Sequence, residues 1–396
     1  MRSSFSEVAT TRPRLPLRSP RLGGIYYPRA LARKACASCA RTCERRLKMS
    51  SSRDTDFQVT VEVPSNIALV KYWGKRDPER QWPANDSLSM TLNAAKSITT
   101  ARVVRGVGGD TLRREDQNGK LVTVDPSDKA LRHVAFLRRE LALDGALDIA
   151  TRNTFPTGCG IASSASGLGA LTLAAIGAWT GSSSFAELAA AGFDRERLAA
   201  LARLGSGSAC RSFHSGYVLW SAGLEPDAQS VMQVYDHEHW QLADLICIVS
   251  REEKAISSSA GHLTAATSPL YRPRLAGLPE RMRRVRAALA ARDLDALGVQ
   301  IEAEALEMHA VMMTATPSLR YLHDASCELI TWLRNERESR GLPAYFTIDA
   351  GPNIHVICQH GDRDKIATRI LAAFPQVTLI SDCTGSGPRI TGRQLA

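Results

Sequence analysis

The chain has 396 residues, of which 44% are hydrophobic and 23% charged, with a formal net charge of +10. Such values are typical of a globular protein with two domains, and no apolar run approaches the ~20 residues of a membrane span. The net charge lies in residues 1–50, which hold 12 Lys/Arg and two acidic residues, so the remainder of the chain is neutral. We therefore expect neither a nucleic acid nor a membrane as a partner.

The basic segment 1–50 is rich in Arg, poor in acids and interrupted by Pro, and it lacks the apolar core of a secretory signal. We expect it to be a disordered extension. Two interpretations stay open. Residues 1–48 have the composition of a transit peptide for import into an organelle. Alternatively, Met49 is the start of translation, and the protein is then expected in the cytoplasm.

The first half of the chain begins with alternating apolar and polar residues, which predict a strand over 57–63 that ends at Pro64. The other elements predicted in this half are strands over 97–104, 148–153 and 216–221, and helices over 127–143, 163–179 and 195–204.

The second half contains longer helical periods. They predict helices over 277–292, 293–313, 317–340 and 362–374, and strands over 242–250, 344–349, 354–359 and 377–381. Strands and helices do not alternate regularly along the chain, which favours an α+β fold over a doubly wound sheet. A polar segment over 225–240 places the domain boundary there, which gives units of 57–235 and 236–396.

A Gly- and Pro-rich loop over 153–169 runs through Ser163 and Ser164 into an Ala/Leu-rich helix. Small residues let the backbone approach a ligand, and a helix N-terminus favours phosphate oxygens. No Gly-Lys-Ser/Thr follows, so this is not a Walker loop. The alternative is an ordinary turn before a buried helix. The candidate phosphate-binding residues of this loop are Pro156, Gly158, Gly160, Ser163, Ser164 and Ala165.

Six motifs in order along the chain together resemble the mevalonate diphosphate decarboxylases, a family of the GHMP small-molecule kinase superfamily. The distinctive ones are Lys71-Tyr-Trp-Gly-Lys75, Gly205-Ser-Gly-Ser-Ala-Cys-Arg211 and Asp349-Ala-Gly-Pro-Asn353. The other three motifs are Asn85–Ser89, Asn153–Gly167 and Gly385–Pro388.

The resemblance implies a two-domain GHMP-kinase-like α+β fold with the active-site cleft between the domains, and it implies a homodimer. The implied reaction converts mevalonate 5-diphosphate and ATP to isopentenyl diphosphate, ADP, phosphate and CO2, in isoprenoid and sterol precursor biosynthesis. Magnesium is implied as the partner of ATP, with no protein ligand assigned, because Mg²⁺ mostly binds phosphates and water in such sites.

Three catalytic residues follow from the resemblance. Asp349 orients the substrate hydroxyl and accepts its proton, Arg211 binds the substrate carboxylate, and Lys71 pairs with Asp349 and holds it ionised. Without the resemblance, a turn residue that caps its own backbone is the favoured interpretation of Asp349, and Arg211 would be a surface residue of a loop.

The candidate substrate-binding residues are carried over in the same way. They are Asn66, Tyr72, Lys75, Ser206, Ser208, Ser257 and Ser258. The sequence departs from the family pattern at Ala255, where a second Lys is usual, and at His262, where Met is usual. These departures make the assignment of Ser257 and Ser258 the weakest of the set.

Two other functions compete with decarboxylation. A related GHMP kinase would phosphorylate mevalonate or its monophosphate, but the combination of Asp349, Arg211 and Lys71 favours decarboxylation. A basic scaffold or nucleic-acid-binding protein rests on the net charge alone, and that charge is confined to the extension.

Overall fold

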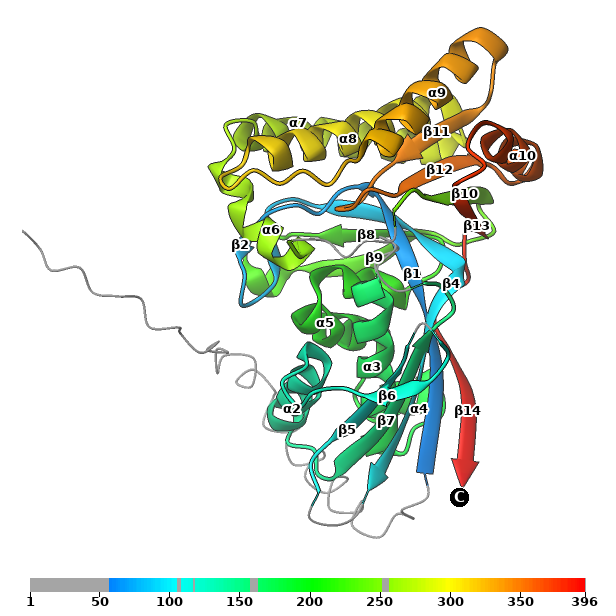
Figure 1. Cartoon of the computed structure of the whole chain (residues 1–396). Coiled ribbons are helices and arrows are strands. Elements are labelled where there is room, and N and C mark those ends of the chain that lie inside the picture. Colours follow the sequence, from blue (N-terminus) through cyan, green and yellow to red (C-terminus); the bar gives the residue numbers. More distant parts are fainter. Residues whose placement is uncertain (1–56, 105–107, 117, 157–162, 251–255, 396) are drawn as a thin grey trace, which may run out of the picture.

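The structure, a computed structural model, describes residues 57–104, 108–116, 118–156, 163–250 and 256–395. Two α+β units are stacked on each other, each built on its own sheet (Figure 1). Residues 1–56, with the basic extension, lie outside the described residues, as do Gly158 and Gly160 of the glycine-rich loop.

The first unit has an eight-stranded sheet in the order β14-β1-β4-β7-β5-β6, and β8 joins it beside β4 and carries β9. Its strands are β1 (Phe57–Val70), β4 (Ser87–Val104), β5 (Thr111–Glu115), β6 (Leu121–Thr123), β7 (Ala146–Asn153), β8 (Tyr217–Ser221) and β9 (Ser230–Tyr235), with a small ribbon of β2 (Lys75–Asp77) and β3 (Trp82–Pro83). Its helices are α2 (Lys129–Leu141), α3 (Ser163–Thr180), α4 (Phe185–Ala190), α5 (Arg195–Gly205), η3 (Gly207–Phe213) and η4 (Pro226–Ala228).

The second unit has a four-stranded sheet in the order β11-β12-β10-β13. Its strands are β10 (Leu242–Ile248), β11 (Ala344–Thr347), β12 (Ile354–Gln359) and β13 (Thr378–Cys383). Its helices are α6 (Ser258–Thr264), η5 (Ala265–Thr267), α7 (Tyr271–Ala291), α8 (Leu294–Thr314), α9 (Asp324–Arg340), η6 (His360–Asp362) and α10 (Arg363–Ala373). One face of the sheet packs with α7 and α8, and the other with α9 and α10.

The prediction that the first strand ends at Pro64 is wrong, because β1 continues to Val70. The pairing of β1 with β4 shifts register between Pro64 and Asn66. Proline has no N–H to donate to the strand pairing, and a β-bulge accommodates this missing hydrogen bond. The pairing of β1 with β4 therefore resumes beyond the bulge. The longer strand carries Asn66 and the residue that follows its end, Lys71, to the region between the two units.

The last strand, β14 (Arg389–Leu395), was not predicted, and it changes the division into units. It pairs antiparallel with β1, the first strand of the chain. The expected second unit, 236–396, is therefore not separate, since its last residues complete the first sheet. The predicted helix over 317–340 also begins later, at Asp324, where His323 and Ser326 form a capping box.

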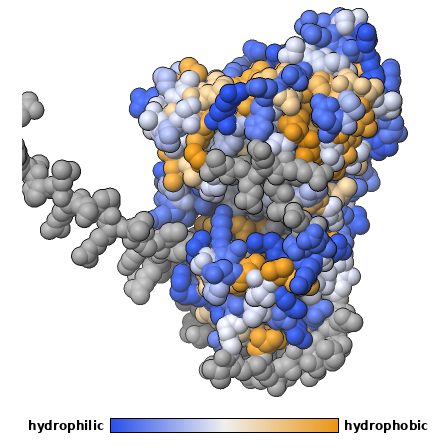
Figure 2. All heavy atoms as spheres, in the orientation of Figure 1, coloured by the Kyte–Doolittle hydropathy of each residue, from blue (hydrophilic) through white to orange (hydrophobic). Residues whose placement is uncertain are grey.

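The surface shown in Figure 2 mixes hydrophilic and hydrophobic residues over both units. Among the described residues, the exposed large hydrophobic side chains are distributed over separate elements, including Leu121, Leu224, Leu263, Val299 and Leu371. Within the same part of the chain, no helix has the length and apolar character needed to span a bilayer.

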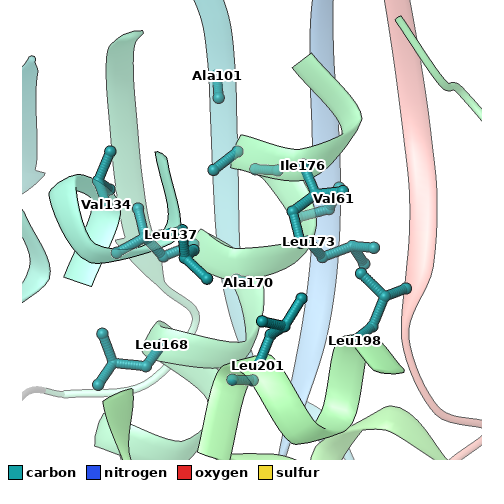
Figure 3. Close-up of a cluster of buried hydrophobic side chains, with 14 of the residues drawn as sticks. Val61, Ala101, Val134, Leu137, Leu168, Ala170, Leu173, Ile176, Leu198 and Leu201 are labelled. Carbon is teal, nitrogen blue, oxygen red and sulfur yellow. The ribbon is translucent and has the colours of Figure 1, made fainter. Parts of the chain in front are cut away.

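Helix α3 is the centre of the first unit's core and is buried on almost every side. Figure 3 shows Leu168, Ala170, Leu173 and Ile176 of this helix among side chains of the sheet, α2 and α5. Its small residues allow close packing: a Cβ added at Gly169 would lie 3.0 Å from the Val63 side chain of β1. Because the helix is fixed along its length, the position of its N-terminus, with Ser163 and Ser164, is fixed too.

Glu304 of α8 joins the two units through a buried set of polar contacts. Its carboxylate is fully buried and accepts hydrogen bonds from the backbone N–H of Lys71 (3.0 Å), from Arg274 (2.5 Å) and from Arg281 (2.7 Å). One carboxylate therefore ties α7 and α8 to the end of β1, where candidate site residues begin.

We expect Glu304→Gln to lower the free energy of unfolding by about 3–5 kcal/mol, because the loss of one partner leaves buried guanidinium charge uncompensated. Urea unfolding at neutral pH measures this change. The matched control is Glu307→Gln, which removes a partly exposed partner of Arg281 and is expected to cost less than ~1 kcal/mol. Equal effects of the two substitutions would contradict the assignment of Glu304 as the joint.

Candidate active site

The centre of the site is an ion pair between the two units. Lys71 follows β1 of the first unit, and Asp349 follows β11 of the second. Lys71 Nζ lies 2.7 Å from Asp349 Oδ1, with the lysine side chain 1% exposed and the aspartate 25% exposed. His309 of α8 donates from Nε2 to the Asp349 carbonyl oxygen at 3.0 Å, which fixes the backbone there. The carboxylate is thus held by a buried cation and still reaches the surface.

The electrostatics of Asp349 favour its charged form. Burial alone raises the pKa of this carboxyl, but the opposing effects of Lys71, His355 and Arg211 outweigh it, so the pKa lies below the ordinary value. An ionised carboxylate can accept a hydrogen bond or a proton from a hydroxyl. The side chain is not used to cap its own turn, since its bond is to Lys71.

Arg211 of η3 lies buried near this pair and is held by neutral groups. Its Nε donates to Asn66 Oδ1 at 3.2 Å and one terminal nitrogen donates to Ser87 Oγ at 2.9 Å. Asn66 is held in turn by Ser212 Oγ at 2.9 Å. Among the described residues, Arg211 has no carboxylate at ion-pair distance. A buried guanidinium with neutral partners keeps its charge available for an anionic ligand.

The N-terminus of α3, which follows the glycine-rich loop, lies beside the same region. Ser206 donates from Oγ to Ser164 Oγ at 3.4 Å, which joins the N-terminus of α3 to the segment that carries Arg211. Ser208 contributes its carbonyl oxygen, which accepts from Asn66 at 3.4 Å. In α3, Ser164 is exposed and Ala165 is buried, while Ser163, its first residue, is half-buried. Pro156, which precedes the undescribed part of the loop, is exposed.

Tyr72 packs its ring against Trp220 and His262, with ring centroids 4.7 and 4.2 Å apart. Its hydroxyl is buried and has no hydrogen-bond partner among the described residues. A Cβ added at Gly207 would lie 2.8 Å from the Tyr72 ring, so this glycine is required for the close approach. A buried hydroxyl without a partner is costly and suits a ligand contact.

Lys75 on β2 is a further cation of this region. Burial, with a further contribution from Lys129, lowers the pKa of Lys75 to about 8. Both effects disfavour its charged form, and a bound anion would relieve them. This environment is suited to phosphate.

The structure gives less support to Ser257 and Ser258 as substrate-binding residues than to the other candidates. Ser257 is exposed and caps α6, accepting from the N–H of Ala260, and Ser258 is the first residue of that helix. Neither side chain contacts the central pair. The same helix does reach the site through His262, whose Nδ1 accepts from the N–H of Gly74 at 3.0 Å. The described residues contain no group of three or more His, Cys, Asp or Glu side chains that could hold a metal ion.

Sequence reasoning missed Ser87, Glu304, His309 and His355 as parts of this site. Glu304 had a usable signal, since it lies at the helical spacing of the apolar residues of α8. A carboxylate on the core face of a helix requires a partner. Ser87 lies within the motif Asn85–Ser89, although no role was assigned to it. The others lie in strands and helices whose neighbours reveal nothing of the contacts made across the units.

The site combines serines at a helix N-terminus with charged residues contributed by two α+β units. This combination indicates a protein of the GHMP superfamily. Residues 63–232 match the family model "Diphosphomevalonate decarboxylase-like N-terminal domain", and residues 244–391 match "Mevalonate 5-diphosphate decarboxylase C-terminal domain". The chain belongs to the diphosphomevalonate decarboxylase family.

Individual relatives support the same family assignment. The chain is 36% identical over 351 residues to diphosphomevalonate decarboxylase of Ganoderma lucidum, covering 83% of this chain and 85% of the relative. It is 33% identical over 343 residues to the enzyme of Saccharomyces cerevisiae, covering 82% and 83%.

Solved structures agree as well. Mevalonate diphosphate decarboxylase of Staphylococcus aureus matches with a TM-score of 0.76 and 29% identity, covering 85% of this chain and 98% of that one. A structure described as "MDDEF in complex with MVAPP, AMPPCP and Magnesium" matches with a TM-score of 0.75 and 30% identity, covering 85% and 99%.

These findings confirm the predicted family, the α+β fold and the activity. The activity is the ATP-dependent decarboxylation of mevalonate 5-diphosphate in the mevalonate pathway. The roles of individual site residues stay predictions.

We expect Lys71→Met to destabilise the protein in a pH-dependent way. In the unsubstituted protein, the lowered pKa of Asp349 gives stability that is present above the ordinary carboxyl pKa and is lost as pH falls through the lowered one. Without Lys71, burial raises the pKa of Asp349, so the loss, about 3 kcal/mol at neutral pH, shrinks as the pH falls and the carboxylate is protonated.

Urea unfolding at several pH values measures this dependence. The control is Lys96→Met, which breaks a partly exposed pair with Glu62 and is expected to cost less than ~1 kcal/mol at every pH. A deficit in Lys71→Met that does not change with pH would show that the ion pair is not its origin.

Proposed function

We propose that this chain binds mevalonate 5-diphosphate and ATP between its two units, with Asp349, Arg211 and Lys71 as its catalytic residues. The observation that carries the proposal is the 2.7 Å pair of Lys71 and Asp349, formed across the units beside the buried Arg211. An ionised carboxylate and an available guanidinium are the two groups that a substrate with a hydroxyl and a carboxylate requires.

The proposed chemistry has two stages. Asp349 accepts the proton of the tertiary hydroxyl while the hydroxyl oxygen attacks the γ-phosphorus of ATP, and the bond to ADP breaks. The C–O bond to the new phosphate then breaks, and the electrons of the C–C bond to the carboxylate form the double bond of isopentenyl diphosphate as CO2 leaves. Arg211 holds the carboxylate in position, and Lys71 keeps Asp349 ionised before substrate binds.

We assign the binding of the phosphate groups to the serines and to Lys75. The candidate contacts to the substrate diphosphate and backbone are Asn66, Tyr72, Lys75, Ser206, Ser208, Ser257 and Ser258. The unpartnered Tyr72 hydroxyl and the environment of Lys75 support this assignment most strongly. For ATP we assign Pro156, Ser163, Ser164 and Ala165, with Gly158 and Gly160 outside the described residues.

Magnesium fits this site as an ion carried on phosphate. The described residues form no carboxylate cage, and Mg²⁺ in nucleotide sites keeps several waters and binds substrate phosphates. No protein ligand is assigned to the ion; Ser164, exposed at the start of α3, is assigned to the nucleotide phosphates. When bound, the ion neutralises phosphate charge.

The assembly and location are also proposals. We propose a homodimer, which light scattering of the purified chain tests. We propose units of 57–235 and 236–388, with β14 returning to the first, and a basic extension over 1–50. The protein is assigned to the cytoplasm, or to an organelle if residues 1–48 act as an import sequence. Imaging of fluorescent fusions with and without residues 1–48 separates the two.

The second candidate reaction is phosphoryl transfer without decarboxylation, as in a related GHMP kinase. Incubation with ATP, magnesium and mevalonate 5-diphosphate distinguishes them, because coupled decarboxylation releases ADP and CO2 in equal amounts. ADP without CO2 would favour the kinase.

We expect Arg211→Gln to weaken binding and orientation of the substrate carboxylate while ATP binding stays nearly intact. The loss of one charge-assisted pair in a buried site corresponds to about 2–5 kcal/mol in kcat/KM. Steady-state kinetics measure this loss, and Arg197→Gln, on the exposed face of α5, serves as the control. An unchanged kcat/KM in Arg211→Gln would exclude the assigned role.

We expect Asp349→Asn to lower the rates of ADP formation and CO2 release together, because phosphorylation precedes decarboxylation. The loss of a general base corresponds to a decrease of ~10²–10⁴-fold. Both products are followed in one assay, and the melting temperature is measured in parallel to exclude unfolding. Normal ADP formation without CO2 would mean that Asp349 acts after phosphoryl transfer, contrary to the proposal.

A further inference from the structure

A second buried pair lies behind Asp349, and neither of its members has a role in the two chemical stages proposed above. Asp244 of β10 and His355 of β12 are 0% and 1% exposed, and His355 Nδ1 lies 2.8 Å from Asp244 Oδ2. Both belong to the central strands of the second sheet. An ionisable pair at this depth is costly unless its charges and hydrogen bonds are balanced.

The sheet register brings this pair close to the catalytic carboxylate. His355 lies opposite Thr347 of β11, and Asp349 follows Thr347 by two residues. His355 also lies opposite Ile246 of β10, two residues from Asp244. His355 therefore lies near the end of the sheet from which the chain continues to Asp349, and Asp244 lies on the other side of His355, farther from that end.

Polar atoms remain without partners around this pair. Among the described residues, His355 Nε2, Asp244 Oδ1 and Thr347 Oγ1 are buried and have no hydrogen bond. Buried polar atoms without partners are rare and cost stability, and apolar side chains could fill the same strand positions. Stability alone therefore gives no account of this pair.

The charges around Asp349 point to a reason. The groups that face it are Lys71 at the end of β1, Arg211 of η3 and His355 of β12, with Asp244 of β10 behind His355. Beyond these, Glu304 of α8 faces Lys71, Asp382 of β13 faces Asp244, and His309 of α8 binds the Asp349 carbonyl. Acidic and basic side chains alternate from Asp244 through His355 and Asp349 to Lys71.

We propose that Asp244 and His355 are positioning residues: Asp244 holds the His355 ring as an imidazolium, and this buried cation keeps Asp349 ionised as the acceptor of the substrate proton. Neither residue touches the substrate in this scheme. The inference rests on the proposed role of Asp349 as the base.

The pair itself has one alternative state. Burial raises the pKa of Asp244, and the neighbouring His355 offsets part of that effect. A neutral carboxyl beside a neutral imidazole would satisfy the same hydrogen bond. Asp349 would then lack the positive charge of His355. The protonation state of the His355 ring therefore decides between a positioning pair and a structural one.

The first test is the pH dependence of kcat in the full chain for His355→Gln, Asp244→Asn and the double variant. Loss of the imidazolium should move the acidic limb to higher pH by about one unit, the low end of the effect of a nearby opposite charge. Both single variants remove the same cation, so the double variant should move the limb no further. The control His360→Gln, an exposed position just after β12, should keep the original limb.

An acidic limb that coincides with that of the unsubstituted protein in both single variants would overturn the proposal. Asp349→Asn in the same series distinguishes a failure of the proposed base from a failure of the proposed positioning role. If that variant is fully active, the proposed base is wrong. If it is inactive while the other variants show no shift, only the positioning role fails.

The second test needs no variant to be active. The chain contains nine histidines, and nitrogen NMR of ¹⁵N-histidine-labelled protein at neutral pH reports whether both ring nitrogens carry protons. His355→Gln assigns the His355 signal by its disappearance, or, if that variant does not fold, His355→Lys provides the assignment while retaining a cation. An imidazolium signal supports the proposal, and a neutral ring overturns it.

Discussion

The ion pair of Lys71 and Asp349 is the constraint on which the arrangement of this molecule depends. The two charges come from different units, and each is brought by the end of a strand: Lys71 by β1 and Asp349 by β11. A partly buried carboxylate 2.7 Å from a buried ammonium tolerates little displacement, because the ammonium alone in this region would be costly. The relative position of the two units is therefore tied to the geometry of the candidate site.

The rest of the structure limits the freedom of this pair. Glu304 fixes the backbone of Lys71 and is itself neutralised by Arg274 and Arg281. On the other side, His309 fixes the backbone of Asp349. β14 adds to this by returning the end of the chain to β1, so that the polypeptide crosses between the units twice. Preorganised groups of this kind need no reorganisation when the substrate binds.

Much of the fold could be predicted because it depends on local patterns. The helices α3, α5 and α8 and the strand β12 lie where hydrophobic periodicity places them. The failures have a common cause. The continuation of β1 past Pro64 and the existence of β14 are set by pairing with strands far away in the chain. Tertiary pairing of this kind overrides local signals such as a proline.

The same division applies to the site. Lys71, Arg211 and Asp349 lie in short distinctive motifs, and the resemblance to a known family named them. Glu304 and His355 lie in no motif. Ser87 lies in the motif Asn85–Ser89, but its role depends on a contact with Arg211, 124 residues away. Glu304 likewise acts through Lys71, 233 residues away. The buried carboxylate of Glu304 had a signal of its own in the sequence, as a charge on an apolar helix face.

The charges of Asp349 and Arg211 have opposite kinds of surroundings, and the difference fits their proposed tasks. Asp349 is paired with a full counter-charge, which lowers its pKa and keeps it ionised, yet a quarter of its side chain stays exposed. Arg211 is 3% exposed, and its partners Asn66 and Ser87 orient it without neutralising it. A guanidinium loses its proton only under extreme conditions, so it needs no counter-ion to stay charged. What it needs is orientation, and neutral oxygens supply that while leaving its charge for the substrate carboxylate. The carboxylate, whose protonation can change, receives the cation instead.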